Sequence, residues 1–545
     1  AHSQPRMFAL AFSSGGTPAS FQARAISTEP AAPRWPQEIT TGVKLSPAKD
    51  AYVVDHFALP SDNPWRRAVR PADIQFLRDG TAVVVTLDGD VWLARGLGDA
   101  AGKPRWRRFA SGLHEPMTVA IRDEQIYAFD KNGIWHLRDT NNDGEADVHE
   151  LFSNAFAQTA DMREFPSQVR LAPGGEFVIA KGGQQATYEG KHNGTVLRIS
   201  ADGKKSTLLG YGFRQPNIGV NVRTGLVTSS DQQGQYIPST PLHIVRDKQF
   251  YGFLGPFRPK EQYPAPIADP LTWIPHPVNT SAISQAWLFG AKMGPLNDAL
   301  VHIGFNKPEL FRVLLNERTQ RLQAAVVSIT RAFEFTPLNG SVNPADGQFY
   351  LAGFQVLGWG NILDTGAGLG RVRYTGAPVT LPREIVPMDQ GVLLRFDVAL
   401  DQKKGNGFVV DLHAAALTGL QFGLGECFDE RHDPTTLKFG ADSRPRLSCT
   451  LLVPDLTIHT LAQRLDHAFQ TEAQHHFFKE AIHHRLARAE LGQAARHQIK
   501  QNRRIDLPGG RTMRAAHVIG EDFKARDRIH ARIVAQEQRA ILLVC

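Results

Sequence analysis

Cysteine is scarce in this 545-residue chain, and its three cysteines, Cys427, Cys449 and Cys545, all lie late. Residues 1–402 contain none, which excludes disulfides and thiolate metal sites from that part. This absence is compatible with an oxidising compartment. No apolar run approaches the roughly 20 residues that a membrane helix needs, so we expect no transmembrane segment.

Export signals are also missing. The apolar stretch MFALAF at 7–12 is too short for a signal-peptide core, and the chain begins at Ala1. We interpret the chain as a mature or truncated product whose signal is already gone. A secreted or periplasmic location is therefore expected.

Several catalytic motifs are absent from the sequence. It has no CxxCH haem site, no HExxH, no GxSxG nucleophile elbow and no Walker loop. The net charge of +7 is concentrated after residue 402, where acidic residues are interspersed with the basic ones. We expect no nucleic-acid partner, because no nucleic-acid-binding motif accompanies this charge.

A loose repeat runs through residues 70–376. A polar residue and a proline precede an alternating apolar segment, usually followed by a turn and a second such segment. Alternation with a period of two, separated by Asp-Gly or Gly-Gly, predicts β-hairpins. Repetition at this spacing predicts an all-β fold, a six-bladed β-propeller, with an irregular β-sandwich array as the alternative. The six prolines are Pro71, Pro116, Pro166, Pro216, Pro277 and Pro337.

The repeat also predicts a site. Proline suits the start of a strand, and each innermost strand of a propeller lines the central channel. The residues before the prolines would then ring the channel mouth and bind a polar small molecule such as a sugar. The alternative is that they are loop residues paired with one another. These residues are Arg70, His114, Glu115, Arg163, Glu164, Arg214, Gln215, His276 and Glu334.

The stretch RDTNNDGEADVHE (138–150) matches the calcium-loop pattern D-x-[DN]-x-[DN]-G-x5-E. Calcium needs six to eight oxygens, and clustered carboxylates repel one another without a counter-ion. The flanking segments are strand-like, so we predict a structural calcium loop between strands. The alternative is a solvated Asx-rich turn. The expected ligands are Asp139, Asn141, Asp143, the backbone carbonyl of Glu145, Asp147 and Glu150.

Several segments resemble the glucose/sorbosone dehydrogenase family of β-propellers. They include DNPWRRAVRPADIQFLRDGTAVVVTLDGDVW, GLHEP, LRDTNNDGEADVHELF, NGTVLRISADG, GYGFRQPNIGVN, SDQQGQYIPSTPLH and NPADGQFYLAG. The likeness runs in order from about Tyr52 to Gly376 and is greatest to the large secreted branch often joined to haem-binding domains. The resemblance implies pyrroloquinoline quinone and calcium as cofactors, and oxidation of sugars at the channel mouth.

The resemblance also implies roles for individual residues. GFRQPN matches the segment that supplies an arginine and an amide to the quinone, implying Arg214 and Gln215. SDQQG matches a segment near the cofactor, implying Asp231 and Gln232. The family's general base is a histidine before the third blade's inner strand, where this chain has EFPSQVRL. His114, one blade earlier, is the nearest substitute, so we take His114 and Arg214 as the candidate catalytic residues.

Three functional hypotheses follow. The first is a sugar or polyol oxidoreductase that passes electrons to the quinone and then to a cytochrome. The second is a non-catalytic propeller of the same ancestry that binds carbohydrate or a protein, and the missing histidine favours it. The third is a metal-assisted lactonase-like hydrolase, which would need a metal in the channel.

The sequence pattern at the end of the chain differs from that of the rest. We expect an N-terminal extension at 1–50, the propeller at 51–378 and the remnant of a β-sandwich module at 379–402. Residues 403–545 form a basic, histidine-rich tail, mostly helical or disordered, with a helix expected at 459–504. Loss of alternation there also suggests translation out of frame or a fusion scar.

Overall fold

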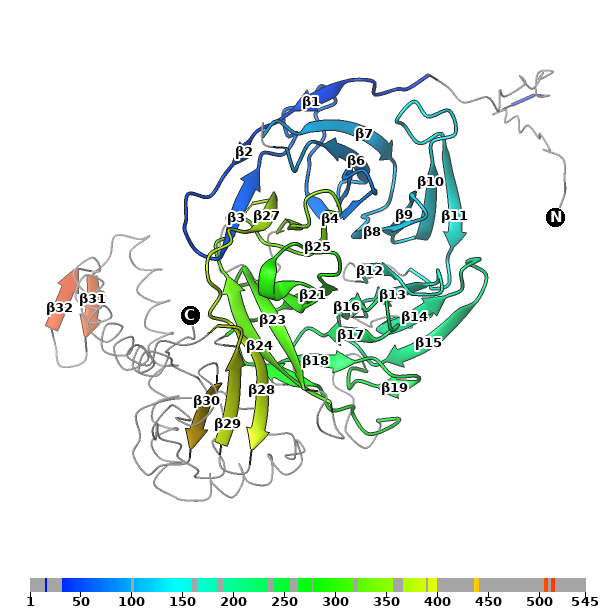
Figure 1. The fold of residues 1–545 in the computed structure, drawn as a ribbon. Helices are drawn as coiled ribbons and strands as arrows, with labels where there is room; N and C mark the ends of the chain where they lie inside the picture. Colours follow the sequence, from blue (N-terminus) through cyan, green and yellow to red (C-terminus); the bar gives the residue numbers. More distant parts are fainter. Residues whose placement is uncertain are drawn as a thin grey trace.

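Six mainly antiparallel sheets surround a common centre in the computed structural model of this chain (Figure 1). The structure describes residues 15–16, 32–99, 102–158, 164–183, 190–233, 237, 239–254, 263–276, 278–316, 322–355, 366–388 and 391–398, and the strands at 436–440, 504–507 and 511–514.

The first three blades follow one another along the chain. Blade 1 contains β4 (Pro71–Phe76), β5 (Ala82–Thr86), β6 (Asp90–Arg95) and β7 (Arg105–Ser111), with β1 (Glu38–Thr40) at its outer edge. Blade 2 contains β8 (Thr118–Arg122), β9 (Gln125–Asp130), β10 (Gly133–Arg138) and β11 (Val148–Ser153). Blade 3 contains β12 (Pro166–Leu171), β13 (Phe177–Lys181), β14 (Thr195–Ile199), β15 (Ser206–Tyr211) and, parallel to β15, β19 (Gln249–Phe250).

The other three blades complete the ring. Blade 4 contains β16 (Asn217–Val220), β17 (Val227–Ser230), β18 (Thr240–Ile244) and β20 (Thr272–Ile274). Blade 5 contains β21 (Ala282–Trp287), β22 (Leu300–Gly304), β23 (Glu309–Asn316) and β24 (Gln323–Thr330). Blade 6 contains β25 (Asn339–Val342), β26 (Phe349–Gly353), β27 (Gly368–Tyr374), β3 (Tyr52–Phe57) and β2 (Val43–Lys44).

The innermost strands form a closed circle, which confirms the six-bladed propeller. Each inner strand contacts the inner strand of the next blade, in the order β4, β8, β12, β16, β21, β25 and back to β4. Pro71 and Pro166 are the first residues of β4 and β12, and Pro216 directly precedes β16. Pro116 and Pro337 each stand two residues before an inner strand. The repeated prolines therefore mark the entries to the channel, while Pro277 lies outside the described residues.

The ring closes by pairing the two ends of the propeller segment. In blade 6, β3 from the N-terminal side pairs antiparallel with β27 from the C-terminal side. Asp55 of β3 is buried and accepts hydrogen bonds from Arg371 Nη2 at 2.7 Å and Arg373 Nε at 2.8 Å. Burial alone would raise the pKa of Asp55, but the bonds from Arg373, the Ser46 backbone and Arg371 outweigh it and lower the pKa. These charge-assisted bonds link residues that lie more than 300 positions apart.

Second strands of the blades are buried on both faces. All five residues of β5 (AVVVT), β13 (FVIAK), β22 (LVHIG) and β26 (FYLAG) are buried. Neighbouring blades cover both sides of these strands, so apolar residues occupy consecutive positions rather than alternate ones. Each large apolar side chain buried in this way contributes about 1.5–3 kcal/mol to stability.

A further, three-stranded sheet follows the six sheets of the propeller. It contains β28 (Pro382–Met388), β29 (Gly391–Phe396) and β30 (Thr436–Gly440), and a separate hairpin pairs β31 (Arg504–Leu507) with β32 (Arg511–Arg514). Arg312 of β23 donates a 3.1 Å bond to the Pro382 carbonyl, which ties β28 to blade 5. The helix expected at 459–504 lies outside the described residues, apart from Arg504, which begins β31.

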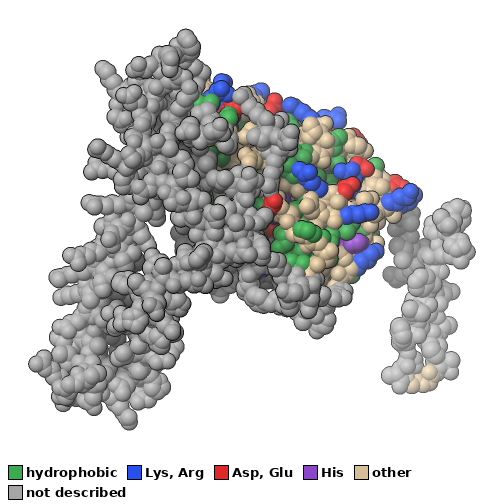
Figure 2. All heavy atoms as spheres, turned by 90° about the horizontal axis from the view of Figure 1, so that it is seen from below, with side chains coloured by type: hydrophobic (Ala, Val, Ile, Leu, Met, Phe, Trp, Pro, Cys, Tyr) green, Lys and Arg blue, Asp and Glu red, His purple; other side chains and the backbone are tan. Residues whose placement is uncertain are grey.

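Among the described residues, no helix has the length and apolar character required to cross a membrane. The face seen in Figure 2 carries lysine and arginine side chains close to acidic ones over its coloured part.

Candidate functional site

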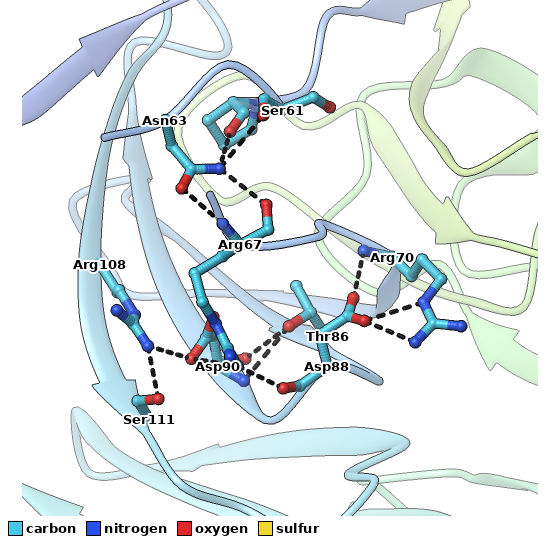
Figure 3. Close-up of polar contacts among 10 residues, drawn as sticks. Ser61, Asn63, Arg67, Arg70, Thr86, Asp88, Asp90, Arg108 and Ser111 are labelled. Carbon is cyan, nitrogen blue, oxygen red and sulfur yellow. Dashed lines mark hydrogen bonds and ion pairs between the residues drawn. The ribbon is translucent and has the colours of Figure 1, made fainter. Parts of the chain in front are cut away.

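Carboxylates hold the entry loops of blades 1 and 2 at the channel mouth. Asp88 accepts a bond from the backbone nitrogen of Arg70 at 2.9 Å and pairs with its Nη2 at 2.6 Å (Figure 3). In blade 2, Asp130 accepts a 2.8 Å bond from the backbone nitrogen of His114. The His114 carbonyl accepts in turn from the Lys131 backbone nitrogen at 3.1 Å. In blades 1 and 2 the backbone before the inner strand is thus fixed by the turn that follows the second strand.

Beside this contact, a further ion-pair network braces blade 1 (Figure 3). Asp90 is fully buried and receives Arg67 Nε at 2.7 Å and Arg108 Nη2 at 2.8 Å. The hydrogen bond that Arg67 donates to Asp90 raises the pKa of Arg67, against the smaller effect of burial. Asn63 holds the same loop through its Oδ1, which accepts the Arg67 backbone nitrogen at 2.9 Å.

The same arrangement in blade 4 holds the arginine and glutamine of GFRQPN. Asp231 is buried, and its carboxylate accepts the backbone nitrogens of Arg214 at 2.8 Å, Gln215 at 2.6 Å and Gln232 at 2.8 Å. Arg214 Nη1 donates to the Gln233 carbonyl at 2.7 Å. Asp231 therefore positions the loop, while the side chains of Arg214, Gln215 and Gln232 remain half-exposed.

Hydrogen bonds from blade 4 extend to both neighbouring blades. Gln215 Nε2 donates to Ser167 Oγ of blade 3 at 2.8 Å. Gln232 Nε2 donates to Ser281 Oγ, at the entry of blade 5, at 3.2 Å, and Asn306 Nδ2 donates to the same oxygen at 3.1 Å. We call these five residues the amide arc. It joins blades 3, 4 and 5 across one side of the mouth.

Two oxygens of the amide arc are buried without a hydrogen-bond partner among the described residues. They are Gln215 Oε1 and Asn306 Oδ1. Gly182 makes room for the first, because a Cβ at that position would collide with the Gln215 amide. Such a buried unsatisfied group costs about 1–3 kcal/mol and requires a reason, such as a ligand or water.

A buried ion pair occupies the blade 3 entry, where the family resemblance implies a histidine. Glu164 is fully buried and lies 3.4 Å from Lys181 Nζ, which is 1% exposed. Asn193 Nδ2 also donates to this carboxylate, and Gln158 Nε2 donates to it at 3.2 Å. Glu164 thus anchors the loop structure of blade 3.

Polar side chains close the channel below the mouth. Arg170 of β12 reaches across to Asp73 of β4 at 2.9 Å and Asn339 of β25 at 2.7 Å. Gln168 Nε2 donates to Asn217 Oδ1 at 2.9 Å. Burial raises the pKa of Asp73, although Arg170 opposes the increase. These five residues link the inner strands across the channel, and we call this cluster the floor.

The floor residues were missed at the sequence level, although a signal exists. Asp73, Gln168 and Asn339 each stand two residues after an entry proline, as does Thr118. These side chains link neighbouring blades: Asp73 accepts the Val119 backbone nitrogen at 3.2 Å, and Thr118 accepts that of Val169 at 2.8 Å. A polar residue at that point of an otherwise apolar strand indicates a channel-lining position.

The remaining residues of the predicted ring differ in their exposure and in their ion-pair partners. The His114 side chain is exposed, and Glu115 pairs with Lys131 at 2.5 Å. His276 is exposed, and its carbonyl accepts from Lys307 Nζ at 3.3 Å. Glu334 pairs with Lys44 of outer strand β2 at 2.5 Å, which draws it to the perimeter of blade 6. Arg163 lies outside the described residues.

The acidic loop between β10 and β11 is folded by its own hydrogen bonds. Asp139 accepts the backbone nitrogens of Asp143 at 3.2 Å and Gly144 at 2.7 Å. Asn141 Nδ2 donates to Asp143 Oδ2 at 3.0 Å, and Thr140 donates to Asp147 at 2.8 Å. Asp139, Asn141 and Asp143 therefore share one tight turn.

The two glutamates of this loop point elsewhere. Glu145 accepts the Arg34 backbone nitrogen at 2.7 Å and its Nε at 2.6 Å, so it fastens the N-terminal segment to blade 2. Glu150 lies 3.7 Å from His136 Nδ1 and 3.9 Å from Arg138 Nε. No three His, Cys, Asp or Glu side chains of the described residues gather as a metal-ligand set.

Comparisons with solved structures find propellers of sugar dehydrogenases. A glucose dehydrogenase-type oxidoreductase from Thermus thermophilus is 16% identical over 59% of this chain and 100% of its own, with a TM-score of 0.43. The PQQ-bound aldose sugar dehydrogenase from Streptomyces coelicolor is 14% identical over 63% and 99%, also at 0.43. The soluble aldose sugar dehydrogenase from Escherichia coli, in its apo form, is 14% identical over 56% and 97%, again at 0.43.

No protein-family model and no curated protein matches the chain. The six-bladed fold rests on the closed circle of this chain's own inner strands. The likeness to these solved structures, at TM-scores of 0.43 and identities of 16% or less, adds no argument to it. A proposal for the activity of this chain must therefore be argued from its own residues.

Proposed function

We propose that this protein is a sugar or polyol oxidoreductase-like propeller whose substrate binds at the channel mouth. The observation that carries the proposal is the blade 4 entry loop. Buried Asp231 holds Arg214 and Gln215 there, above a floor of paired polar residues. A few convergent polar groups that fix the orientation of a ligand are typical of a small-molecule site.

The cofactor of this proposal is pyrroloquinoline quinone. Arg214 and the amides of Gln215 and Gln232 would hold it, and the buried Gln215 Oε1, which has no hydrogen-bond partner among the described residues, fits a role in ligand binding. Arginine suits carboxylate groups, which it binds through two parallel hydrogen bonds. When bound, the quinone supplies the hydride acceptor for sugar oxidation.

His114 is the proposed group that takes the hydroxyl proton of the substrate. Its backbone is held by Asp130 at 2.8 Å, and its exposed side chain extends from the blade 2 entry loop. A base must lie within hydrogen-bond reach of the proton that it accepts. Electron transfer to a cytochrome and a location outside the cytoplasm complete the proposal, in keeping with the cysteine-free propeller.

A second candidate is a non-catalytic sugar-binding propeller. The blade 3 entry favours it, because Glu164 there is fully buried against Lys181 and Asn193. A carboxylate held in this way contributes to stability and is shielded from a substrate. The mouth would then bind a sugar without oxidising it.

Reconstitution distinguishes these two functions. With pyrroloquinoline quinone and calcium added, we expect dye reduction with at least one member of a sugar panel. Arg214→Ala should lower quinone affinity about 10- to 100-fold, because a charged hydrogen bond contributes about 1.5–3 kcal/mol. Arg223→Ala is the matched control, since Arg223 is exposed and pairs with Asp298 at 3.0 Å. Sugar binding without turnover would select the non-catalytic function.

We also propose that the acidic loop binds calcium through Asp139, Asn141, Asp143 and the Glu145 carbonyl. Binding to the folded state alone should raise the melting temperature, with about 2.7 kcal/mol gained at a calcium concentration of 100 Kd. Calorimetric scans with calcium and with a chelator measure this shift. Asp143→Asn should reduce it, because the loop loses one carboxylate. Identical melting in calcium and in chelator would contradict the proposal.

A further inference from the structure

The blade 5 entry differs from those of blades 1, 2 and 4. In those blades a carboxylate, Asp88, Asp130 or Asp231, accepts the backbone nitrogens of the entry loop. In blade 5 the Ser281 backbone nitrogen instead donates to a neutral amide, Gln233 Oε1, at 3.1 Å. The polar groups here are thus neutral amides and hydroxyls, which are suited to hydroxyl ligands.

Ser281 is the central residue of this side of the mouth. It is 6% exposed, and its hydroxyl oxygen accepts from both Gln232 and Asn306. A hydroxyl that accepts two hydrogen bonds retains one proton to donate. Its φ of 54° is left-handed, a conformation that costs a non-glycine residue about 1–2 kcal/mol. Strain of this kind is typical of ligand sites.

Asn306 supplies an acceptor at the same place. Its residue is half-exposed, yet Oδ1 is buried without a partner among the described residues. Whichever way the amide is oriented, one of its two polar atoms stays unpaired. A second buried acceptor without a described partner, Asn279 Oδ1, lies in the same entry loop as Ser281. Its Nδ2 donates to the Lys307 carbonyl at 2.8 Å, which orients that amide.

The positive charges on the other blades of the mouth are matched by carboxylates. Arg70 pairs with Asp88 at 2.6 Å, Lys131 with Glu115 at 2.5 Å and Lys181 with Glu164 at 3.4 Å. The positive charges of blades 1, 2 and 3 are therefore matched within the protein. The groups that contact Ser281 are the uncharged side chains of Gln232, Gln233 and Asn306, and the cation that follows Asn306, Lys307, donates to the His276 carbonyl at 3.3 Å.

We infer that Ser281 and Asn306 form a subsite that binds the hydroxyl groups of a neutral polyol, with Gln232 orienting Ser281. Ser281 donates to one ligand oxygen, and Asn306 Oδ1 accepts from one ligand hydroxyl. This inference rests on the proposed function and narrows it, because it selects uncharged sugars and sugar alcohols over sugar acids. Neither residue is itself a proposed quinone ligand, but Gln232 contacts Ser281. Asn306→Ala is therefore the variant that should change substrate affinity and leave quinone affinity unchanged.

Titration calorimetry on the full chain tests the subsite with four probes. D-glucose and D-sorbitol should bind. D-gluconate, which adds a negative charge, and tetra-O-methyl-D-glucose, which lacks most hydroxyl donors, should each bind at least tenfold more weakly. Asn306→Ala and Ser281→Ala should each weaken glucose or sorbitol binding about tenfold, the effect of one or two neutral hydrogen bonds. Ser341→Ala is the matched control, because its hydroxyl donates to the Ile74 carbonyl at 2.9 Å, away from the mouth.

Ser281→Gly separates binding from stability. Glycine adopts positive φ without strain, so this variant should melt higher than Ser281→Ala while losing glucose binding to the same extent. A purely structural serine would show no such separation. Wild-type binding that persists unchanged in the Asn306 and Ser281 variants would overturn the subsite alone. Failure of the wild-type protein to bind any of the four probes would overturn the proposed function as well.

Discussion

Replacing Arg170 by methionine is expected to destabilise the propeller by about 3–5 kcal/mol. The guanidinium crosses the channel and bonds to Asp73 at 2.9 Å and to Asn339 at 2.7 Å. Asp73 is fully buried, so the variant would leave its carboxylate without a counter-charge. The large effect reflects the unpaired buried charge rather than the strength of the original pair.

Urea unfolding of three variants measures this effect. Arg170→Met alone should lower the unfolding free energy most, and adding Asp73→Asn should restore much of it by removing the stranded charge. Arg198→Met is the matched control, since its side chain is 38% exposed and lies 4.0 Å from Glu176. An exposed pair contributes about 0–1 kcal/mol. Equal losses for Arg170→Met and Arg198→Met would contradict a buried floor.

The loss in Arg170→Met should depend on pH. Burial raises the pKa of Asp73 even with Arg170 present. Without the guanidinium, the pKa should rise further, because an opposing charge is gone. A carboxyl with a raised folded-state pKa favours the folded protein as pH falls, so the difference between variant and wild type should shrink in acid.

The second large effect is loss of stability in mild acid through two buried histidines. Burial lowers the pKa of His243 to about 3 and that of His302 to about 3. His243 packs 4.8 Å from the Tyr251 ring, and His302 Nδ1 lies 3.3 Å from Gln285 Nε2. Both are therefore neutral in the folded protein, whereas the unfolded chain protonates them near pH 6.5.

The direction in which stability changes with pH follows from the number of protons that the folded and unfolded states bind. Between pH 6.5 and about 3 the unfolded state binds more protons, so the stability contributed by the two neutral histidines is lost as pH falls. Each histidine contributes a slope of ~1.4 kcal/mol per pH unit, and the two together ~2.7. Unfolding free energies from urea titrations should approach this slope below about pH 5.5 and level off towards pH 7.5.

Variants isolate the histidines from the other titrating groups. His243→Phe fits the aromatic contacts with Phe213 and Tyr251, and His302→Gln retains a polar partner for Gln285. Each variant should remove about half of the histidine contribution to the slope. A double variant that keeps the wild-type slope would show that other groups cause the acid sensitivity.

Local sequence patterns predicted the architecture because each blade is a nearly independent unit. Entry prolines fix φ and lack a donor, so they stand where a strand begins, as Pro71 and Pro166 do. The polar residues two positions after each of these prolines could in principle have been predicted to line the channel. Their role in linking blades was not, because the Val119 and Val169 partners of Asp73 and Thr118 lie in other repeats.

The roles of individual residues were predicted less completely, because a role depends on the direction in which a loop side chain points. Asp231 was expected beside a cofactor, and the structure shows it buried beneath Arg214 and Gln215 as their anchor. Glu334 was expected at the mouth, yet Lys44 from the N-terminal side draws it outward. Sequence spacing gives no information on such long-range pairing.

The sequence by itself determined the number of blades, the entry points of the inner strands and the turn of the acidic loop, because these follow from hydrophobic periodicity and turn chemistry within a few residues. Only the tertiary structure decided the rest. It paired β3 with β27, closed the channel with Arg170 and joined Gln232, Ser281 and Asn306 across blades. The physical reason is that ring closure brings together side chains from distant repeats, whose burial and partners no local pattern specifies.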